Sequence, residues 1–445
     1  GSMLLVGGCQ HLADTELTMC AAKLLPNGQP DLPFGTNGLV RSSIGGLANS
    51  VNVLANGKIV LGGVVSLGAN DFAMVVARLM PNGALDATFG TNGMSSLLVG
   101  LTVSNAVMSI DASGRIVISG RCLTAPSTAW QMCAARWMPN GSLDTSFGEF
   151  GKVILSSHRL RDSLYVLSPA IIESKLHLGA ICVNAAQSGT FCVARFDENG
   201  QLDLSFGDSG VFEVVVGTPL AGEIAALIPQ GNARLVIAGL CPHATGAAYH
   251  PCFARLSADG QLDTTFGTGG KFIDAATQFT HPLAHATAES DGSIVAVGTC
   301  QSGPSTGNDI CIARYTEDGA RDLALPSTLL PFAGYDAAAF VATDHHGMIT
   351  VAGNCNVETA AFCAYRAHGR AAGNTTCTFD VDGDGTLSAG VDGVLLSRAT
   401  LGFTGNAVLH GLTFPASATR TKWGTGGTDD IRKFLVSQCG MSLSL

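Results

Sequence analysis

The sequence lacks any apolar run near the roughly 18 residues that a membrane-spanning helix needs, so it predicts no transmembrane segment. Charge is also scarce: only 13% of the 445 residues are charged, the net charge is −10, and there is no basic run. A chain without a basic patch is a poor candidate for binding nucleic acid or an anionic membrane surface. What remains, 46% hydrophobic residues and 56 glycines, is typical of a turn-rich, well-buried globular protein.

Familiar catalytic motifs are missing as well. There is no His-Glu-x-x-His metal motif, and the single Gly-x-Ser-x-Gly string, at 303–307, falls in a loop between two cysteines and not in the strand-turn-helix of a nucleophile elbow. The adjacent pair His345-His346 falls in a predicted turn, where a solvated position is the ordinary interpretation. The sequence therefore leans away from an enzyme, although it does not show which residues of distant segments converge in a tunnel.

One phrase recurs along the chain. It reads FCVARFDENGQLDLSFGDSG at 191–210, MVVARLMPNGALDATFGTNG at 74–93 and MCAARWMPNGSLDTSFGEFG at 132–151. The turn glycines of the successive copies are Gly28, Gly83, Gly141, Gly200, Gly260, Gly319 and Gly369. Self-similarity at a period of about 50–60 residues is the signature of a repeat architecture.

One repeat can be divided into four short strands. Its apolar, β-rich runs are 152–157, 162–169, 175–182 and 191–196, and turn residues separate them. Four antiparallel strands at this period are one blade of a β-propeller. We expect 152–157 to be the innermost strand of its blade and 191–196 the outermost.

The strand count predicts seven blades. Seven third strands and seven fourth strands are present, but only six pairs of first and second strands, so the first blade is incomplete. The predicted fold is mostly β, a seven-bladed β-propeller of four-stranded antiparallel blades over 4–370. A small α-helical module is predicted over 371–445.

The phrase itself has a structural explanation. Asn199-Gly200 supplies a turn with positive φ, Phe206 is expected to fill the seam between blades, and Gly207 lets the backbone turn. The aspartate of the phrase recurs as Asp31, Asp86, Asp144, Asp203, Asp263 and Asp322. Six equivalent carboxylates fit a role in which each accepts a bond from the N–H two residues on, whereas acid/base catalysis needs an unequal pair.

The phrase x-A-R-L-x-x-x-G-x-L-D-x-x-F-G resembles the delta-60 repeat family of bacterial extracytoplasmic β-propellers. The resemblance covers about residues 4–370. It implies the propeller fold and an extracytoplasmic location, and it implies no general activity. The sixth copy departs from the pattern, with Leu325-Pro326 in place of Phe-Gly.

Cysteine usage predicts disulfides. Twelve of the fourteen cysteines form six close pairs at one place in the repeat, and the second repeat lacks both members, with Val64 and Val75 near those positions. Joint loss is expected of a disulfide and not of a metal site. The predicted bonds are Cys9–Cys20, Cys122–Cys133, Cys182–Cys192, Cys241–Cys252, Cys300–Cys311, Cys355–Cys363 and Cys377–Cys439.

Such pairing indicates an oxidising compartment, so the protein is expected to be secreted, periplasmic or on the cell surface. The opening Gly1-Ser2-Met3 is expected to be a cloning remnant, with any signal peptide removed ahead of it.

The loops between paired cysteines differ in every repeat, whereas the turns expected on the other face are short and uniform. Variation on one face of a scaffold favours recognition there, although unconstrained loops also drift. The candidate contacts are Trp130, His243, Tyr249, His250 and Phe279. We expect a monomer that binds a glycan or protein partner. The alternatives are a carbohydrate-active hydrolase or lyase that uses the face or tunnel, and a structural component of a surface assembly.

The C-terminal module carries a candidate calcium site. Residues 380–385 read Asp-x-Asp-x-Asp-Gly, as in the first half of an EF-hand loop, and three carboxylates this close repel one another without a cation. The predicted Ca²⁺ ligands are Asp380, Asp382, Asp384, Thr386 and Asp392. Position 12 is Val391, so the usual closing acid is displaced by one residue. The alternative is an acidic turn without metal.

The loop and the helix after it resemble half of a dockerin module, and also short calcium-bearing modules that end some secreted bacterial proteins. Helices are expected at 391–400 and 428–437. Thr428, with Asp429 and Asp430, is the expected cap of the second helix.

Overall fold

The structure is a computed structural model that describes most of the chain. The described residues are 2–9, 17–26, 28–68, 71–125, 130–155, 167–183, 189–217, 223–242, 249–276, 283–301, 308–322, 328–330, 337–343, 348–355, 361–368, 381, 391, 394–395, 406–425 and 428–437. Two compact units are present. Unit 1 comprises Gly1–Ala244, Cys252–Thr264 and Thr268–Lys271, and unit 2 comprises Thr245–Pro251, Thr265–Gly267 and Phe272–Leu445.

The described residues are mostly β strand, in antiparallel sheets whose strands follow chain order. The first sheet has six strands: β1 (Met3–Cys9), β2 (Thr18–Leu24), β3 (Leu39–Val53), β4 (Ile59–Gly68), β5 (Asp71–Leu79) and β6 (Met94–Leu97). The first part of β3 pairs with β2 and the second part, from Gly46, pairs with β4. Gly46 has a φ of 149° at this change of partner, a conformation that favours glycine.

Four sheets of four strands follow. They comprise β7 (Thr102–Ile110), β8 (Ile116–Leu123), β9 (Trp130–Trp137) and β10 (Lys152–Leu155); β11 (Leu167–Ile172), β12 (Lys175–Val183), β13 (Gly189–Phe196) and β14 (Val211–Val214); β15 (Glu223–Gln230), β16 (Arg234–Pro242), β17 (Tyr249–Leu256) and β18 (Lys271–Ile273); and β19 (Leu283–Ala288), β20 (Ile294–Gln301), β21 (Asn308–Tyr315) and β22 (Thr328–Leu330). A three-stranded sheet contains β23 (Ala337–Thr343), β24 (Met348–Cys355) and β25 (Ala361–His368). None of the described sheets is closed on itself.

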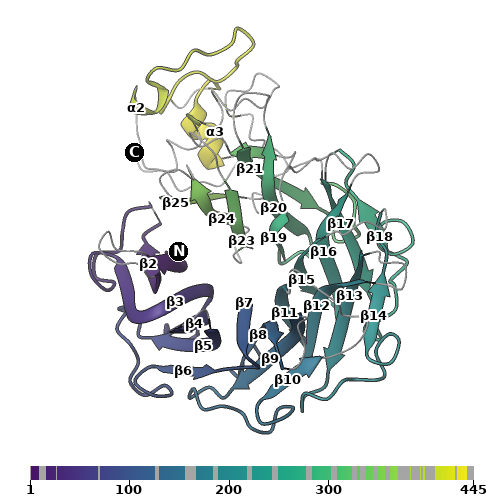
Figure 1. The fold of residues 1–445 in the computed structure, drawn as a ribbon. Helices are drawn as coiled ribbons and strands as arrows, with labels where there is room; N and C mark the ends of the chain where they lie inside the picture. The colour runs from purple at the N-terminus through teal and green to yellow at the C-terminus, as the bar shows by residue number, and fades with distance from the viewer. Residues whose placement is uncertain are drawn as a thin grey trace. The chain divides into compact units, whose positions relative to one another are not determined.

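One sequence prediction about strand order is wrong. Residues 152–157 were expected to form the innermost strand of a new blade, but β10 pairs with β9 of the preceding repeat. Within unit 1, β7, β11 and β15 are the inner strands and β10 and β14 lie outermost (Figure 1). The physical reason is a tight reversal, in which the Gly151 N–H donates to the Phe147 carbonyl at 2.9 Å and the chain returns beside the strand that it has just left.

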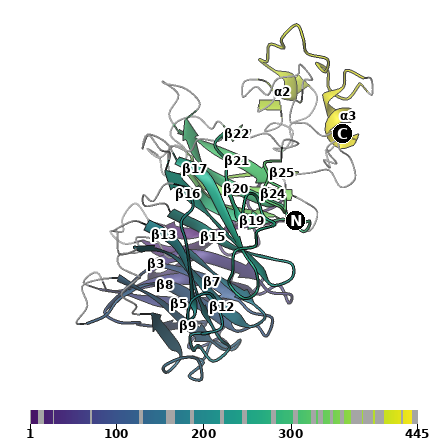
Figure 2. The ribbon, with the colours of Figure 1, turned by 90° about the vertical axis from the view of Figure 1, so that its right-hand side faces the viewer.

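Hydrophobic side chains of unit 1 fill the spaces between consecutive sheets. Val117 and Met132 of one sheet belong to the same buried cluster as Leu178 and Ala194 of the next sheet. Both faces of these sheets are therefore covered, which explains why the strands are continuous apolar runs without strict alternation. Figure 2 shows the strands of unit 1 from the side.

The described residues of unit 2 include the short helices α2 (Asn406–Leu409) and α3 (Ile431–Ser437). The second helix expected from the sequence is confirmed in α3, although its N-cap is Asp430 and not Thr428. The Asp430 carboxylate accepts from the N–H groups of Arg432 at 2.9 Å and Lys433 at 3.3 Å, groups that the helix itself leaves unpaired. For the helix expected at 391–400, the structure describes only residues 391 and 394–395.

Candidate recognition face

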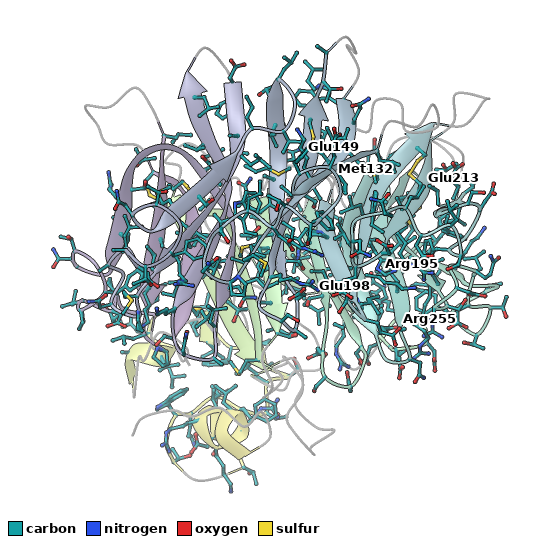
Figure 3. All side chains as sticks on the ribbon, turned by 90° about the horizontal axis from the view of Figure 1, so that it is seen from below. Met132, Glu149, Arg195, Glu198, Glu213 and Arg255 are labelled. Carbon is teal, nitrogen blue, oxygen red and sulfur yellow. A yellow bond between two sulfur atoms is a disulfide. The ribbon has the colours of Figure 1, made fainter. Side chains whose placement is uncertain are left out.

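The sheets of unit 1 have two chemically different ends. Because consecutive strands are antiparallel, the recurring phrase and the short inner hairpins share one end, here called the phrase end. The cysteine-bounded loops share the other, the loop end. Figure 3 shows Arg195 and Glu198 toward the phrase end and Met132 and Glu213 toward the loop end. The predicted sorting of loops between two faces is therefore confirmed for unit 1.

At the phrase end, the strand that precedes the phrase carries a cation that bonds the aspartate of the phrase; it is Lys23 in the first repeat and an arginine in β5, β9 and β13. The Nε atoms of Arg78, Arg136 and Arg195 donate to their aspartates at 2.7, 2.8 and 2.9 Å. Each guanidinium also lies over the phenylalanine of its phrase, at 4.6, 4.4 and 4.5 Å from the ring centroid. Nη1 then donates to a backbone carbonyl in the turn of the next repeat, as in the 2.6 Å bond from Arg136 to Glu198. We call this arrangement the latch.

The aspartates have the structural role that the sequence predicted. Asp86, Asp144 and Asp203 each accept through Oδ1 from the N–H two residues on, at 3.1, 3.2 and 3.1 Å. The hydroxyl of that same residue donates to Oδ1 as well, at 2.6, 2.5 and 2.6 Å. Because both carboxylate oxygens have protein partners, these aspartates are not free for acid/base chemistry.

Phe206 fills the seam between two repeats, as the sequence predicted. Its ring is fully buried against Gly260 of the next repeat, where an added Cβ would lie 2.6 Å from the ring. The neighbouring Gly207 N–H donates to the carbonyl of Asp259 at 3.0 Å. Gly260 has a φ of 79°, so both its conformation and its contact exclude a larger residue.

The latches differ in their second cation. Lys58 and Lys175 donate to Asp86 and Asp203 at 2.8 Å, and these hydrogen bonds hold the pKa of both carboxyls well below the usual range. Asp144 has no such lysine. Arg115 occupies the place of Lys58 and Lys175 in its repeat, but its guanidinium bonds other carboxylates.

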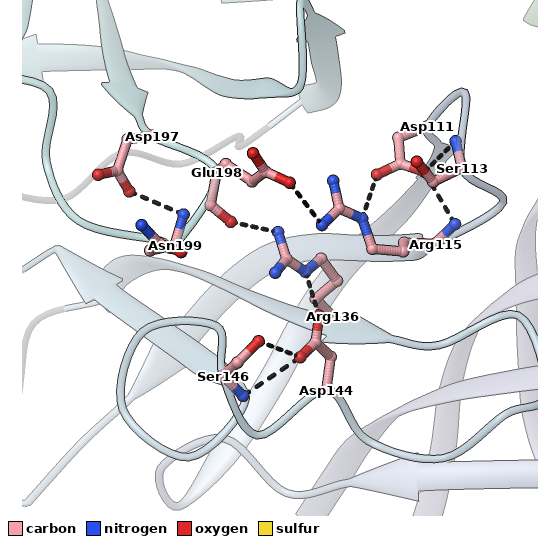
Figure 4. A network of polar contacts seen from close by, with 9 residues as sticks. All are labelled: Asp111, Ser113, Arg115, Arg136, Asp144, Ser146, Asp197, Glu198 and Asn199. Atoms are coloured by element: carbon pink, nitrogen blue, oxygen red, sulfur yellow. Dashed lines mark hydrogen bonds and ion pairs between the residues drawn. The ribbon is translucent and has the colours of Figure 1, made fainter.

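Figure 4 shows the alternative partners of Arg115. Its guanidinium bonds Asp111 at 2.6 Å and Glu198 of the next repeat at 3.2 Å. Asp144 therefore depends on Arg136 for its neutralisation. Burial works against the ionised form of Asp144, yet the bonds from Ser146 and Arg136 keep its pKa below the ordinary value.

At the loop end, five of the predicted disulfides are formed. They are Cys9–Cys20, Cys122–Cys133, Cys182–Cys192, Cys241–Cys252 and Cys300–Cys311, with Cα–Cα distances of 5.8 to 6.0 Å. For the sixth pair, the backbone places Gly353 opposite Cys363, as Gly120 is opposite Cys133. Cys377 and Cys439 lie outside the described residues.

The register refines the position of the missing bond in the second repeat. Val75 takes the place of Cys133, since Gly63 is opposite Val75 as Gly120 is opposite Cys133. The residue in the place of Cys122 is consequently Val65, one position beyond the Val64 indicated by the sequence. Two valines of one buried cluster therefore stand where other repeats have the disulfide.

Trp130, the candidate contact on β9, begins its strand directly after a cysteine-bounded loop. Its ring is half-buried, and the guanidinium carbon of Arg121 lies 4.8 Å from the ring centroid. Arg121 also donates to the Ser104 hydroxyl at 3.3 Å, and nearby the Thr124 hydroxyl donates to the Gln131 side chain at 2.7 Å. The result is an aromatic ring flanked by a cation and a hydroxyl, whereas the side chain of Gln131 lies on the opposite face of the strand.

Comparison of the repeats shows that the place of Trp130 is special. It lies three residues before the second cysteine, or before the valine that replaces it. The residues at this place in the described repeats are Leu17, Phe72, Trp130, Gly189, Tyr249 and Asn308. Large apolar side chains therefore recur at the roots of the loops. Sequence reasoning missed Leu17, Phe72, Arg121 and Ser104, although counting back from each cysteine identifies the first two.

The other predicted site residues have different outcomes. Tyr249 is exposed, at 38%, whereas His250 is buried, at 4%, and is poorly placed for a ligand. His243 and Phe279 lie outside the described residues, as do all five predicted calcium ligands. Within the described ranges, no group of three or more His, Cys, Asp or Glu side chains could hold a metal ion. A search of the same residues finds no helix long and apolar enough to span a membrane.

Taken together, the repeated four-stranded sheets are those of a β-propeller. Four segments of the chain, 54–89, 182–206, 234–266 and 289–324, match the family described as "Domain of unknown function (DUF5122) beta-propeller". These segments coincide with strands and phrases of four repeats. No curated protein matches the chain.

Solved structures similar to the chain are distant in sequence. A protein of unknown function from Dyadobacter fermentans is 13% identical, with a TM-score of 0.42, and the match covers 72% of this chain and 93% of that one. The β-propeller domain of the trilobed protease from Pyrococcus furiosus is 9% identical, with a TM-score of 0.44, over 83% and 90%. An α-L-arabinanase from Penicillium chrysogenum is 11% identical, with a TM-score of 0.41, over 72% and 92%.

Several similar structures are described as glycoside hydrolases or polysaccharide lyases. These descriptions correspond to the enzyme alternative of the sequence analysis more closely than to its main expectation. Likeness at these TM-scores concerns the general architecture and carries no argument about the activity of this chain.

Proposed function

We propose that the protein is an extracytoplasmic recognition protein whose loop end binds a carbohydrate. The observation that supports this is the pair of Trp130 and Arg121 at the root of a loop closed by Cys122–Cys133. An aromatic ring offers an apolar face to the C–H groups of a sugar, while the adjacent guanidinium and hydroxyl groups match its hydroxyls. A disulfide at the loop root pre-organises the contact, which lowers the entropic cost of binding.

Replacing Trp130 with asparagine should weaken carbohydrate binding at least about tenfold, equivalent to about 1.4 kcal/mol, with little change in melting temperature. Asparagine is the matched choice because Asn308 stands at the same place in a later repeat. A glycan array on the wild type selects the ligand, and titration calorimetry then compares the two proteins. Leu85→Asn at the phrase end is the control and should bind normally. Equal affinities of wild type and Trp130→Asn would locate recognition elsewhere.

The second candidate function is a carbohydrate-active enzyme that uses the same end of the sheets. It is supported by β-bulges in the inner strands, between Ala48 and Ser50 in β3, between Ser104 and Val107 in β7, and in β11 and β15. Bulges redirect side chains and are frequent beside active sites. A screen for released reducing ends and for unsaturated products, run on every glycan that binds, separates the two functions. A third possibility, a structural component of a surface assembly, predicts neither binding nor cleavage.

We extend the architecture to seven blades of the delta-60 repeat type over 4–370, followed by a module over 371–445. The seven strands that match the third strand predicted for each repeat, β1, β4, β8, β12, β16, β20 and β24, support this count. Five disulfides in the described residues are consistent with an oxidising compartment. We propose that the protein is secreted, periplasmic or held at the cell surface.

The module over 371–445 is proposed to bind Ca²⁺ through Asp380, Asp382, Asp384, Thr386 and Asp392. Calcium that binds only the folded module should stabilise it by about 2.7 kcal/mol at a hundredfold excess over Kd. Calorimetry should therefore show a C-terminal transition that moves to lower temperature with a chelator, and Asp382→Ala should remove this response. Asp259→Ala, in a phrase-end turn, is the control and should keep it. No Ca²⁺ uptake at about 1 mM would leave an acidic turn in place of the site.

A further inference from the structure

Phe150 has an unfavourable backbone conformation at the outer edge of its sheet. It lies in the turn between β9 and β10 with a φ of 52°, and its side chain is 75% exposed. The residues at the same place in other repeats are Asn37, Asn92, Ser209 and Gly269. The left-handed conformation suits glycine and asparagine, whereas a bulky side chain there is strained.

The Phe150 side chain does not offset this strain, because a ring that stays exposed in the folded protein contributes little hydrophobic stabilisation. Such outliers persist where they serve a function. Hydrogen bonds hold the backbone of this turn. The Glu149 N–H donates to the Lys152 carbonyl at 2.8 Å, and the Gly148 N–H donates to the Asn199 carbonyl of the next repeat at 2.7 Å. Phe150 is therefore an exposed apolar side chain on a hydrogen-bonded turn.

The shape and charges of this turn indicate the partner. Small ligands bind in concave sites, so a projecting ring needs a partner that covers it. Glu149 and Lys152 flank the ring with opposite charges, and neither side chain has an ion-pair or hydrogen-bond partner among the described residues. In a two-fold contact, Glu149 of one copy would face Lys152 of the other, and the two rings would meet on the axis.

We propose that the Glu149–Lys152 turn is a self-association site at which two copies of this chain pair through Phe150. This goes beyond carbohydrate recognition. One turn covers far less than the roughly 800 Å² per partner of a stable interface, so the dimer should be weak and reversible. The proposal replaces the monomer expected from the sequence.

Sedimentation equilibrium from about 1 µM to about 1 mM tests the proposal, a range that detects a dimer with Kd up to the millimolar level. The wild type should shift from monomer toward dimer, and Phe150→Asn should stay monomeric. Because Asn37 and Asn92 occupy the same conformation, the variant should melt no lower than the wild type. Ser209→Asn is the matched control, because Ser209 occupies the equivalent position in the next repeat. This variant should associate as the wild type does.

The charge pair supplies an independent check. Glu149→Lys and Lys152→Glu should each weaken association about tenfold, and the double variant should restore it, since the swap re-creates the two-fold match. A wild type that remains monomeric at about 1 mM overturns the proposal. So does equal association of Phe150→Asn and wild type, or a double variant no better than either single one.

Discussion

Arg136→Ala should destabilise unit 1 by about 3–5 kcal/mol, because it leaves the buried Asp144 carboxylate without its cation. The two side chains are only 5% and 8% exposed and meet at 2.8 Å. The same change removes the bond to the Glu198 carbonyl and the contact with the Phe147 ring. The lost contacts join two repeats, so denaturant unfolding should show an earlier midpoint.

Arg195→Ala is the matched comparison and should cost distinctly less. It removes the same kind of carbonyl bond and ring contact, but Lys175 remains at 2.8 Å from Asp203. Lys175→Met combined with Arg195→Ala should then approach the cost of Arg136→Ala, because Asp203 loses both cations. Equal costs for the two single variants would show that the second cation contributes nothing and that the latch acts only through packing.

The acid response of the latches follows from the same contacts. Hydrogen bonds from Lys58 and Lys175 keep the pKa of Asp86 and Asp203 far below the usual value of about 3.8 in the folded protein. A depressed carboxyl pKa contributes stability that is present above the unfolded pKa and is lost as pH falls through the folded one. The latches should consequently remain intact through mildly acidic conditions.

Much of the fold could be predicted from the sequence, because the same local pattern recurs in successive repeats. Four Asn-Gly turns, five seam phenylalanines and six cysteine pairs display the same local contacts in parallel. Strand neighbours were harder to infer. The run at 152–157 is equally apolar whether it joins β9 or starts a new sheet, and only the Phe147–Gly151 reversal decides between them.

The candidate site was predictable only in part. Trp130 is conspicuous in the sequence, but Arg121 is not, because its contact with the ring depends on the register of β8 against β9. The prediction of His250 as a ligand contact has the same weakness. Side chains alternate between the two faces of β17, and that of His250 is buried. Side chains on adjacent strands meet through pairing that a single sequence does not specify.

His177 occupies a core position of β12 at which other repeats carry valine. Val60, Val117, Val236 and Val295 stand at the corresponding place. The imidazole is 4% exposed, packs edge-on against Phe206 with ring centroids 5.5 Å apart, and lies opposite Arg195 in the strand register. Burial, and then the positive charge of Arg195, lowers its pKa from 6.5 to about 4. In the folded protein this histidine is neutral at any pH above that value.

His177 should therefore make the wild type lose stability as pH falls from about 6.5 toward about 4, where the unfolded chain binds a proton that the folded chain does not. The gap between the two pKa values corresponds to about 3 kcal/mol, at 1.36 kcal/mol per pKa unit. His177→Val should abolish this loss. The free energy of unfolding of the variant, relative to that of the wild type, should therefore be about 2–3 kcal/mol higher at pH 4.5 than at pH 7.5.

Denaturant unfolding at the two pH values measures the difference, and the acid response of the carboxylates cancels because both proteins share it. The exposed His410→Val should follow the wild type at both pH values. Parallel pH profiles for His177→Val and wild type would contradict this prediction. They would mean that folding does not lower the pKa of His177, despite its burial and the positive charge of Arg195.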